Sequence, residues 1–172
     1  MVATVRRPKS VRVASGVYAA YTVLMLEVDR RMRRTGGPGI IAFELAGEAD
    51  RANDIMTLWG VRGRRLARAS LWLDFGYMVS YSALAALLVD RTLRRRGHPR
   101  ALTTFVAGAL GGDAIEGIAL LRVLKGRGIA TDVRRARVAA LTKFALLAVC
   151  LVYVVAGNAM PVTKPGRDLH SV

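Results

Sequence analysis

The chain has 172 residues, of which 53% are hydrophobic, yet it carries a formal charge of +15 from 27 Lys and Arg against 12 Asp and Glu. A water-soluble domain rarely combines that hydrophobicity with that charge. The two properties separate into alternating apolar and arginine-rich blocks, which is typical of helices that cross a bilayer and of the loops that flank them. The composition therefore argues against a soluble domain and predicts a multi-span membrane protein.

The first apolar block, VRVASGVYAAYTVLMLEV at residues 11–28, is the shortest and most polar of four, and the basic run DRRMRRTGGPG follows it. A cleaved signal peptide is the alternative, because the segment before the block is also basic. No small-residue A-x-A site follows the apolar part, and Glu27, Asp29 and several arginines come instead. We therefore expect a retained membrane span.

The connection at residues 39–65, GIIAFELAGEADRANDIMTLWGVRGRR, mixes apolar and charged side chains in runs too short to span a bilayer. It predicts two short amphipathic helices at the membrane interface or over the mouth of the bundle, with Asp50 as an N-cap and Trp59 at head-group depth. A solvent-exposed helical hairpin that only connects two spans is the alternative, and the sequence leaves both open.

Three further apolar blocks, each long enough at about 1.5 Å per residue to cross a hydrocarbon core of about 30 Å, occupy residues 66–89, 101–124 and 137–160. The short loops between them favour antiparallel neighbours. Residues 1–172 therefore form one predicted domain, an all-α, four-helix transmembrane bundle with an interfacial amphipathic helical segment. We expect it in the cell membrane as a multi-pass protein, with its orientation left open because Lys and Arg divide almost evenly between the two sides.

Two of these blocks carry carboxylates far from their ends, namely Asp74, Asp113 and Glu116. A charged side chain near the centre of a span costs about 2.5 to 3.5 kcal/mol on the insertion scale, so such groups normally face a bundle interior or a wet cavity. Asp113 and Glu116 are three residues apart and share a helical face. Tyr77 and Tyr81 follow Asp74 at i+3 and i+7 and form one stripe with it.

Antiparallel second and third spans would bring these two acid-bearing faces to a similar depth, where glycines would let the backbones approach closely: Gly108, Gly111, Gly112 and Gly117. Lys143 is the basic residue clearly inside a span, where it either pairs with an acid or extends to the interface. The predicted ligand-binding set is Asp74, Tyr77, Tyr81, Asp113, Glu116 and Lys143, and its three acids are the candidates for any catalytic role.

We predict no metal and no cofactor. The single cysteine, Cys150, lies within the last apolar block, and His98 and His170 lie outside the predicted spans, so no ligand set for haem, copper or an iron–sulfur centre is expected. No phosphate-binding loop or nucleophile elbow is present. The arginines flank spans and meet anionic head groups, so membrane lipids rather than nucleic acid are the expected partners.

Three functions fit these features. The first is a structural or accessory membrane subunit, in which acids and tyrosines hydrogen-bond across helices and the 39–65 connection docks a protein partner. The second is a lipid- or isoprenoid-binding protein or enzyme that uses the intramembrane carboxylates. The third is proton or ion translocation, which uses protonatable groups at mid-depth. The sequence favours the first and does not decide whether the protein is an enzyme.

Four segments carry a resemblance: FELAG at 43–47, IMTLWG at 55–60, LDFGYMVSY at 73–81 and GDAIEGIALL at 112–121. Together they resemble a group of small four-helix integral membrane proteins of bacteria, actinobacterial in type, in which an acid-aromatic second span precedes an Asp-x-x-Glu third span. The resemblance covers residues 12–157 and implies the four-helix architecture and the same three acids. Gly117 stands where that group is expected to have Asn, and the group implies no substrate.

Overall fold

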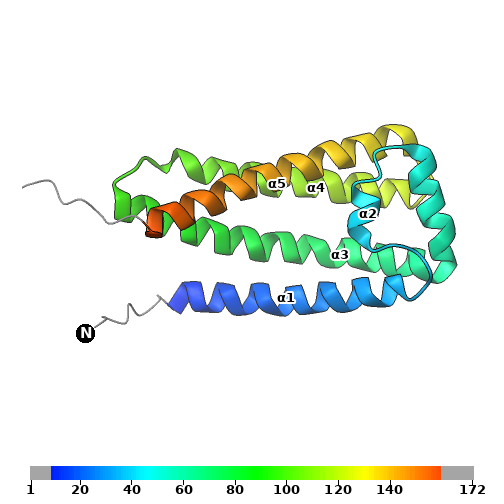
Figure 1. Ribbon diagram of the computed structural model, residues 1–172, viewed down its shortest axis with the longest axis horizontal. Coiled ribbons are helices and arrows are strands. Elements are labelled where there is room, and N and C mark those ends of the chain that lie inside the picture. The colour runs from blue at the N-terminus through cyan, green and yellow to red at the C-terminus, as the bar shows by residue number, and fades with distance from the viewer. Residues whose placement is uncertain (1–8, 160–172) are drawn as a thin grey trace, which may run out of the picture.

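The computed structural model of the protein describes residues 9–159, and these form helices and turns with no strand among them. Four long helices lie side by side, and a short one sits near one end of the bundle (Figure 1). In chain order the elements are α1 (Lys9–Arg33), α2 (Ile40–Glu44), α3 (Ala49–Arg96), the 3₁₀ helix η1 (Arg100–Leu102), α4 (Thr103–Val123) and α5 (Ile129–Ala159). Met160, which ends the fourth predicted span, and His170 lie outside the described residues.

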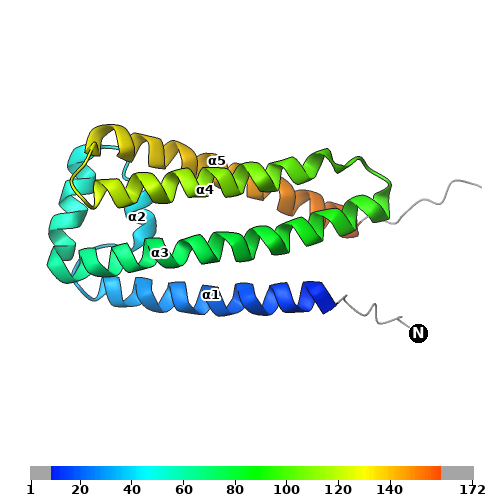
Figure 2. The ribbon, with the colours of Figure 1, turned by 180° about the vertical axis from the view of Figure 1, so that it is seen from behind.

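Successive long helices run antiparallel and leave α1 at one edge of the bundle (Figures 1 and 2). α1 packs along α3, α3 packs against both α4 and α5, and α4 and α5 pack along each other. Within residues 9–159, α1 makes no comparable contact with α4 or α5. α1 therefore joins the bundle mainly through α3.

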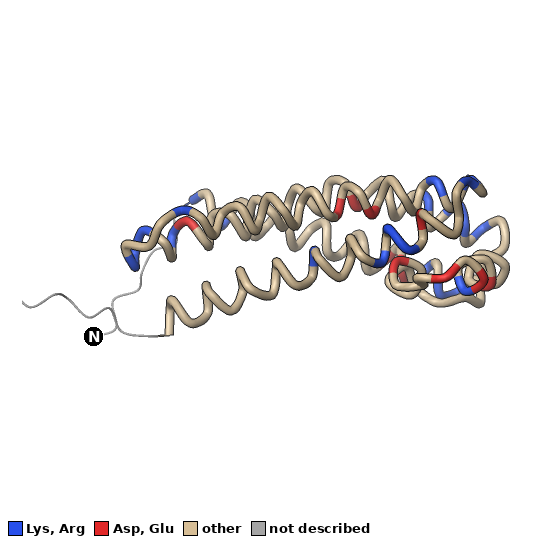
Figure 3. Tube along the Cα trace, turned by 90° about the horizontal axis from the view of Figure 1, so that it is seen from above, with Lys and Arg blue, Asp and Glu red and all other residues tan. Residues whose placement is uncertain are grey.

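Four helical segments are long and apolar enough to cross a membrane: α1, α3, the segment Arg100–Val123 that includes η1 and α4, and α5. Lys and Arg gather toward the two ends of the bundle, and the middle of the long helices is largely uncharged (Figure 3). This distribution matches spans with basic flanks. The predicted all-α fold with four helices of membrane-spanning length is confirmed.

The glycines of α4 serve two different interfaces. A Cβ atom on Gly112 would lie 3.4 Å from the carbonyl oxygen of Ala139 in α5, and one on Gly108 would also meet a side chain of α5. Gly117 instead faces α3, where a Cβ would lie 3.3 Å from the Phe75 ring. The prediction that these glycines lie between the second and third spans is right for Gly117 and wrong for Gly108 and Gly112, which let α4 approach α5.

The 39–65 connection forms α2 and the beginning of α3, with a sharp bend at Gly60. Gly60 has φ 58° and ψ −160°, a backbone conformation that is essentially restricted to glycine. Helical structure resumes directly after the bend, so the helix begins before residue 66, where the second apolar block starts. The difference arises because arginine is a good helix former, so the charges around Arg62 and Arg65 end the apolar stretch without ending the helix.

Side chains of the connection form a buried cluster at the end of the bundle. Trp59 is 2% exposed, its ring lies 5.0 Å from that of Phe43, and its Nε1 donates a hydrogen bond of 2.6 Å to the carbonyl oxygen of Pro38. Trp59 therefore packs inside the protein, and its predicted position at head-group depth stays a prediction. Asp50 is not the N-cap of α3, since Glu48 occupies that position and no side chain caps the helix.

α2 is held against the bundle by a contact to α1. The backbone N–H of Ile40, at the first residue of α2, donates a hydrogen bond of 2.9 Å to Oδ1 of Asp29. The other carboxylate oxygen of Asp29 accepts a hydrogen bond of 2.7 Å from Nε of Arg33. α2 packs against both α3 and α5, and this position carries Glu44, its last residue, to the bundle interior.

Candidate functional site

The centre of the site is a buried lysine of α5 between two carboxylates of α4. Nζ of Lys143 lies 2.6 Å from Oδ1 of Asp113 and 2.7 Å from Oε2 of Glu116. The Asp113 contact is also a hydrogen bond, whereas Oε2 of Glu116 is close enough for an ion pair but lacks hydrogen-bond alignment. Asp113 and Glu116 share one face of α4, as their spacing predicts, and Lys143 pairs with both instead of extending to the interface.

Two predicted residues of α3 complete this centre. The hydroxyl of Tyr81 donates a hydrogen bond to Oδ2 of Asp113, so Asp113 receives bonds from α3 and α5 at once. Asp74 lies two turns before Tyr81 on the same stripe and lines the same cavity. Asp74 makes no hydrogen bond or ion pair within the described part of the chain. The structure thus brings the acids of the second and third predicted spans together.

Tyr77 lies in the same stripe of α3, but its hydrogen bonds and its ring stacking are to residues of α1. Its ring stacks on that of Tyr18, with centroids 5.6 Å apart and planes inclined by 13°, and its hydroxyl donates a hydrogen bond of 3.4 Å to the Tyr18 hydroxyl. The hydroxyl of Thr22 lies 3.5 Å from the Tyr77 hydroxyl. Tyr77 therefore lines the cavity and ties α1 to α3 without contacting the acids.

Glu44 is the residue that the sequence interpretation missed. It is 8% exposed, and burial, followed by the neighbouring charge of Glu116, raises its pKa to about 8. No basic side chain pairs with it among residues 9–159. The signal was present, because Glu44 is the one acid in the apolar run IIAFE, but the side chain could be placed at the site only once α2 was seen to fold inward.

Glu44 and all the predicted site residues except Glu116 line a cavity of about 530 Å³ between α1, α3 and α5. Its polar part is formed by Asp74, Tyr77, Tyr81, Asp113, Lys143 and Glu44. On the side away from α2, the cavity continues between apolar side chains of α3 and α5, which are Leu84, Ala85, Leu88, Val89, Leu147, Cys150, Leu151 and Val154. The site therefore joins a buried ionisable cluster to an apolar channel.

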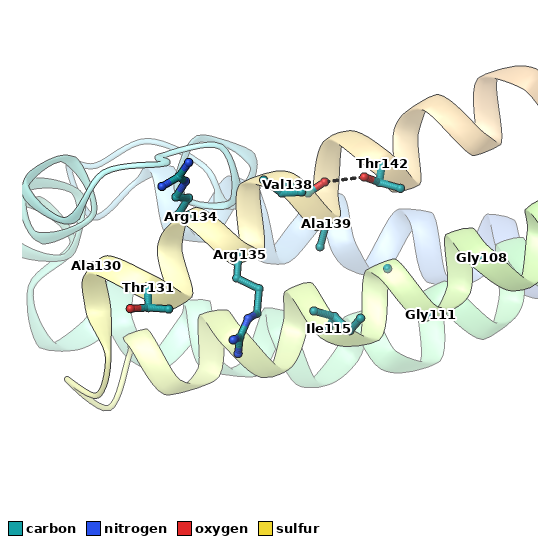
Figure 4. A pocket seen from close by; sticks show the side chains of 11 residues that line it. Gly108, Gly111, Ile115, Ala130, Thr131, Arg134, Arg135, Val138, Ala139 and Thr142 are labelled. Atoms are coloured by element: carbon teal, nitrogen blue, oxygen red, sulfur yellow. Dashed lines mark hydrogen bonds between the residues drawn. The ribbon is translucent and has the colours of Figure 1, made fainter.

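A second depression, of about 840 Å³, lies on another side of the molecule. It is lined by α4 and by the first half of α5 (Figure 4). Gly108, Gly111 and Gly112 contribute to it, and Arg134 and Arg135 lie toward one end. Arg135 also pairs with Asp132 at 3.5 Å. Although this depression is larger, none of the buried carboxylates of the first cavity lines it, so we place the candidate site in the α1–α3–α5 cavity.

Metal binding has no support within the described residues, where no group of three or more His, Cys, Asp or Glu side chains is placed to hold an ion. Carboxylates that converge on a lysine form an ion-pair network instead, because the ammonium supplies the positive charge that a metal would bring. The arrangement can bind a polar group, exchange a proton or hold the helices in register.

No protein family, curated protein or solved structure matches the chain. The function is therefore inferred from the cavity and its side chains.

Proposed function

We propose that the protein is an integral membrane protein that binds an amphiphile in the α1–α3–α5 cavity, with the polar head at the carboxylate and lysine cluster. The observation that carries this proposal is the continuity between buried ionisable groups and an apolar channel in one cavity of about 530 Å³. Small-molecule sites commonly measure about 300 to 1,000 Å³ and combine apolar walls with a few converging polar groups. An amphiphile has the same division.

An accessory role explains only part of the cluster. Lys143 ties α5 to Asp113 and Glu116 of α4, and such a network can hold two helices in register without any ligand. Asp74 and Glu44 have no basic partner of this kind in the described chain, and both line the cavity. Because carboxylates inside a membrane protein are costly to retain, their presence at a cavity supports ligand binding over a purely structural role.

The placement in the membrane belongs to the same proposal. We place α1, α3, α4 and α5 across the cell membrane of a bacterium, with α2 and the part of α3 before Gly60 at the interface. The charge-poor middles of the long helices support this placement (Figure 3). The resemblance of the four sequence segments to small bacterial membrane proteins supports the source.

Filling the cavity tests the proposal. Leu147 lines the cavity, whereas Leu141 on the same helix is 52% exposed on the outside of the bundle. The full chain, purified in a mild non-ionic detergent, should retain an amphiphile in native mass spectrometry. We expect Leu147→Trp to lose that molecule and Leu141→Trp to keep it, because only the first indole occupies the channel. An empty wild-type protein, or equal retention in both variants, would contradict the proposal.

A further inference from the structure

We infer that the ligand carries a cationic amine head, held against Asp74 and Glu44, and a single apolar chain that follows α3 and α5. This inference rests on the amphiphile site proposed above. The class is a long-chain amine without a neighbouring phosphate.

The charge of the cluster favours a cation. Within the described chain, four carboxyl groups, those of Glu44, Asp74, Asp113 and Glu116, lie near one ammonium, that of Lys143. Both close contacts of Lys143 are to Asp113 and Glu116, so it is already shared. Asp29 also lines the cavity, but Arg33 lies 2.7 Å from its Oδ2. The polar part of the site therefore has more carboxyl groups than basic groups, and an added cation would pair with the carboxyl groups that Lys143 does not contact.

Glu44 supplies an independent observation. Its side chain is 8% exposed, lines the cavity and has no basic partner in residues 9–159. The carboxyl groups that face it from α3 and α4 are Asp74, Asp113 and Glu116, and Lys143 faces it from α5. Without a cation paired to it, burial favours the protonated form of Glu44. Because a buried carboxylate is costly unless it is paired, a cationic ligand would supply the positive charge that lets Glu44 ionise beside it.

Other ligand chemistries fit less well. A phosphate or carboxylate head would add negative charge beside four carboxyl groups, which is unfavourable at short range. A divalent cation would need at least a set of converging ligands, and the described residues hold no such set. A hydroxyl head can accept and donate hydrogen bonds but leaves the charge unbalanced. A protonated amine both donates hydrogen bonds to carboxylates and balances their charge.

The apolar channel determines the hydrocarbon part of the ligand. From Lys143 to Val154, α5 advances by about 1.5 Å per residue, so the channel extends for roughly three helical turns beyond the polar cluster. Leu84 and Leu88 of α3 and Leu147 and Leu151 of α5 line this part of the cavity. An apolar lining of this length suits one extended alkyl chain.

The test uses three probes with the same alkyl chain and different heads: dodecylamine, dodecanol and dodecanoic acid. Binding to the full chain is measured by native mass spectrometry from a non-ionic detergent at neutral pH. We expect dodecylamine to bind at least about tenfold more tightly than dodecanol, and dodecanoic acid to bind most weakly. Asp74→Asn should weaken dodecylamine about tenfold while leaving dodecanol unchanged.

Controls separate the possible outcomes. Asp54→Asn removes an exposed carboxylate that does not line the cavity and should leave all three affinities unchanged. Glu44→Gln, outside the four predicted spans, provides a second variant with the expected loss of amine binding if Asp74→Asn does not fold. Dodecanol or dodecanoic acid binding as tightly as dodecylamine would overturn the cationic head and leave the amphiphile site standing. Failure of the wild-type protein to bind any probe would overturn the amphiphile site itself.

Discussion

At the scale of single residues, Lys143 is the side chain on which the buried cluster depends. It is 6% exposed and contacts both carboxylates of α4. Breaking a buried ion pair by removing one partner is strongly destabilising, by about 3 to 5 kcal/mol, because the other charge is left buried without compensation. We predict that Lys143→Met lowers the free energy of unfolding by about that amount, measured by denaturant unfolding in mild detergent.

The matched control is Lys125→Met, which removes an exposed lysine from the turn between α4 and α5 and should change stability by less than about 0.5 kcal/mol. Adding Asp113→Asn and Glu116→Gln to Lys143→Met removes the stranded carboxylates and should recover much of the loss. A triple variant as unstable as Lys143→Met alone would show that the ion pairs are not the cause.

Glu44 predicts a pH dependence whose sign follows from its environment. Burial raises its pKa from 4.5 to about 8, so the folded state holds this proton more tightly than the unfolded state. The resulting stability is fully present below about pH 4.5 and is lost as the pH rises through about 8. We predict that the melting temperature of the wild-type protein falls between pH 5 and pH 9 more steeply than that of Glu44→Gln, which cannot ionise. Parallel curves for the two proteins would contradict this prediction.

At the scale of elements, the bend at Gly60 lets α3 combine a segment at the end of the bundle with a long span. A Cβ at Gly60 would meet no atom within 4 Å, so a substitution there tests the backbone alone. We predict that Gly60→Ala costs about 1 to 3 kcal/mol, because φ 58° with ψ −160° is a region that residues with a side chain occupy only under strain. The measurement is unfolding in mild detergent.

Gly16 offers the comparison for this variant. It lies within α1, and a Cβ there would also meet open space, but its backbone is helical, so alanine should be tolerated or stabilise the helix by up to about 1 kcal/mol. If Gly60→Ala were as stable as Gly16→Ala, the bend would have no intrinsic cost and would be set by packing around Trp59.

Hydropathy predicted where the long helices lie more accurately than it predicted the residues at which they begin and end. Within the described residues, the four apolar blocks lie in helical segments of membrane-spanning length, except that Leu124 follows the end of its segment, because a bilayer requires continuous apolar helices. The helix that contains the second block begins well before residue 66, since hydropathy marks the edge of the apolar stretch and not the last hydrogen-bonded turn. The N-cap prediction for Asp50 was wrong because the residue at the N-cap of α3, Glu48, makes no side-chain hydrogen bond to the helix. A cap of this kind has no recognisable sequence pattern.

At the scale of the whole molecule, the position of α1 creates the candidate site. α1 packs along α3 and makes little contact with α5, and the cavity occupies the space that these three helices line. Tyr18 and Thr22 of α1 reach Tyr77 of α3, which closes one wall. A bundle with the same helices in closer packing would bury the same acids without leaving room for a ligand.

The sequence by itself determined that the chain forms four helical segments long and apolar enough to cross a membrane and that Asp113 and Glu116 share a helical face, because bilayer thickness and helical periodicity act along a single segment. Only the tertiary structure decided that Lys143 joins both acids, that Asp74 lines the cavity with no basic partner in residues 9–159, and that Glu44 enters the site from α2. These contacts join residues far apart in the chain, and no local period specifies them. Helix packing and the inward fold of α2 set which side chains meet.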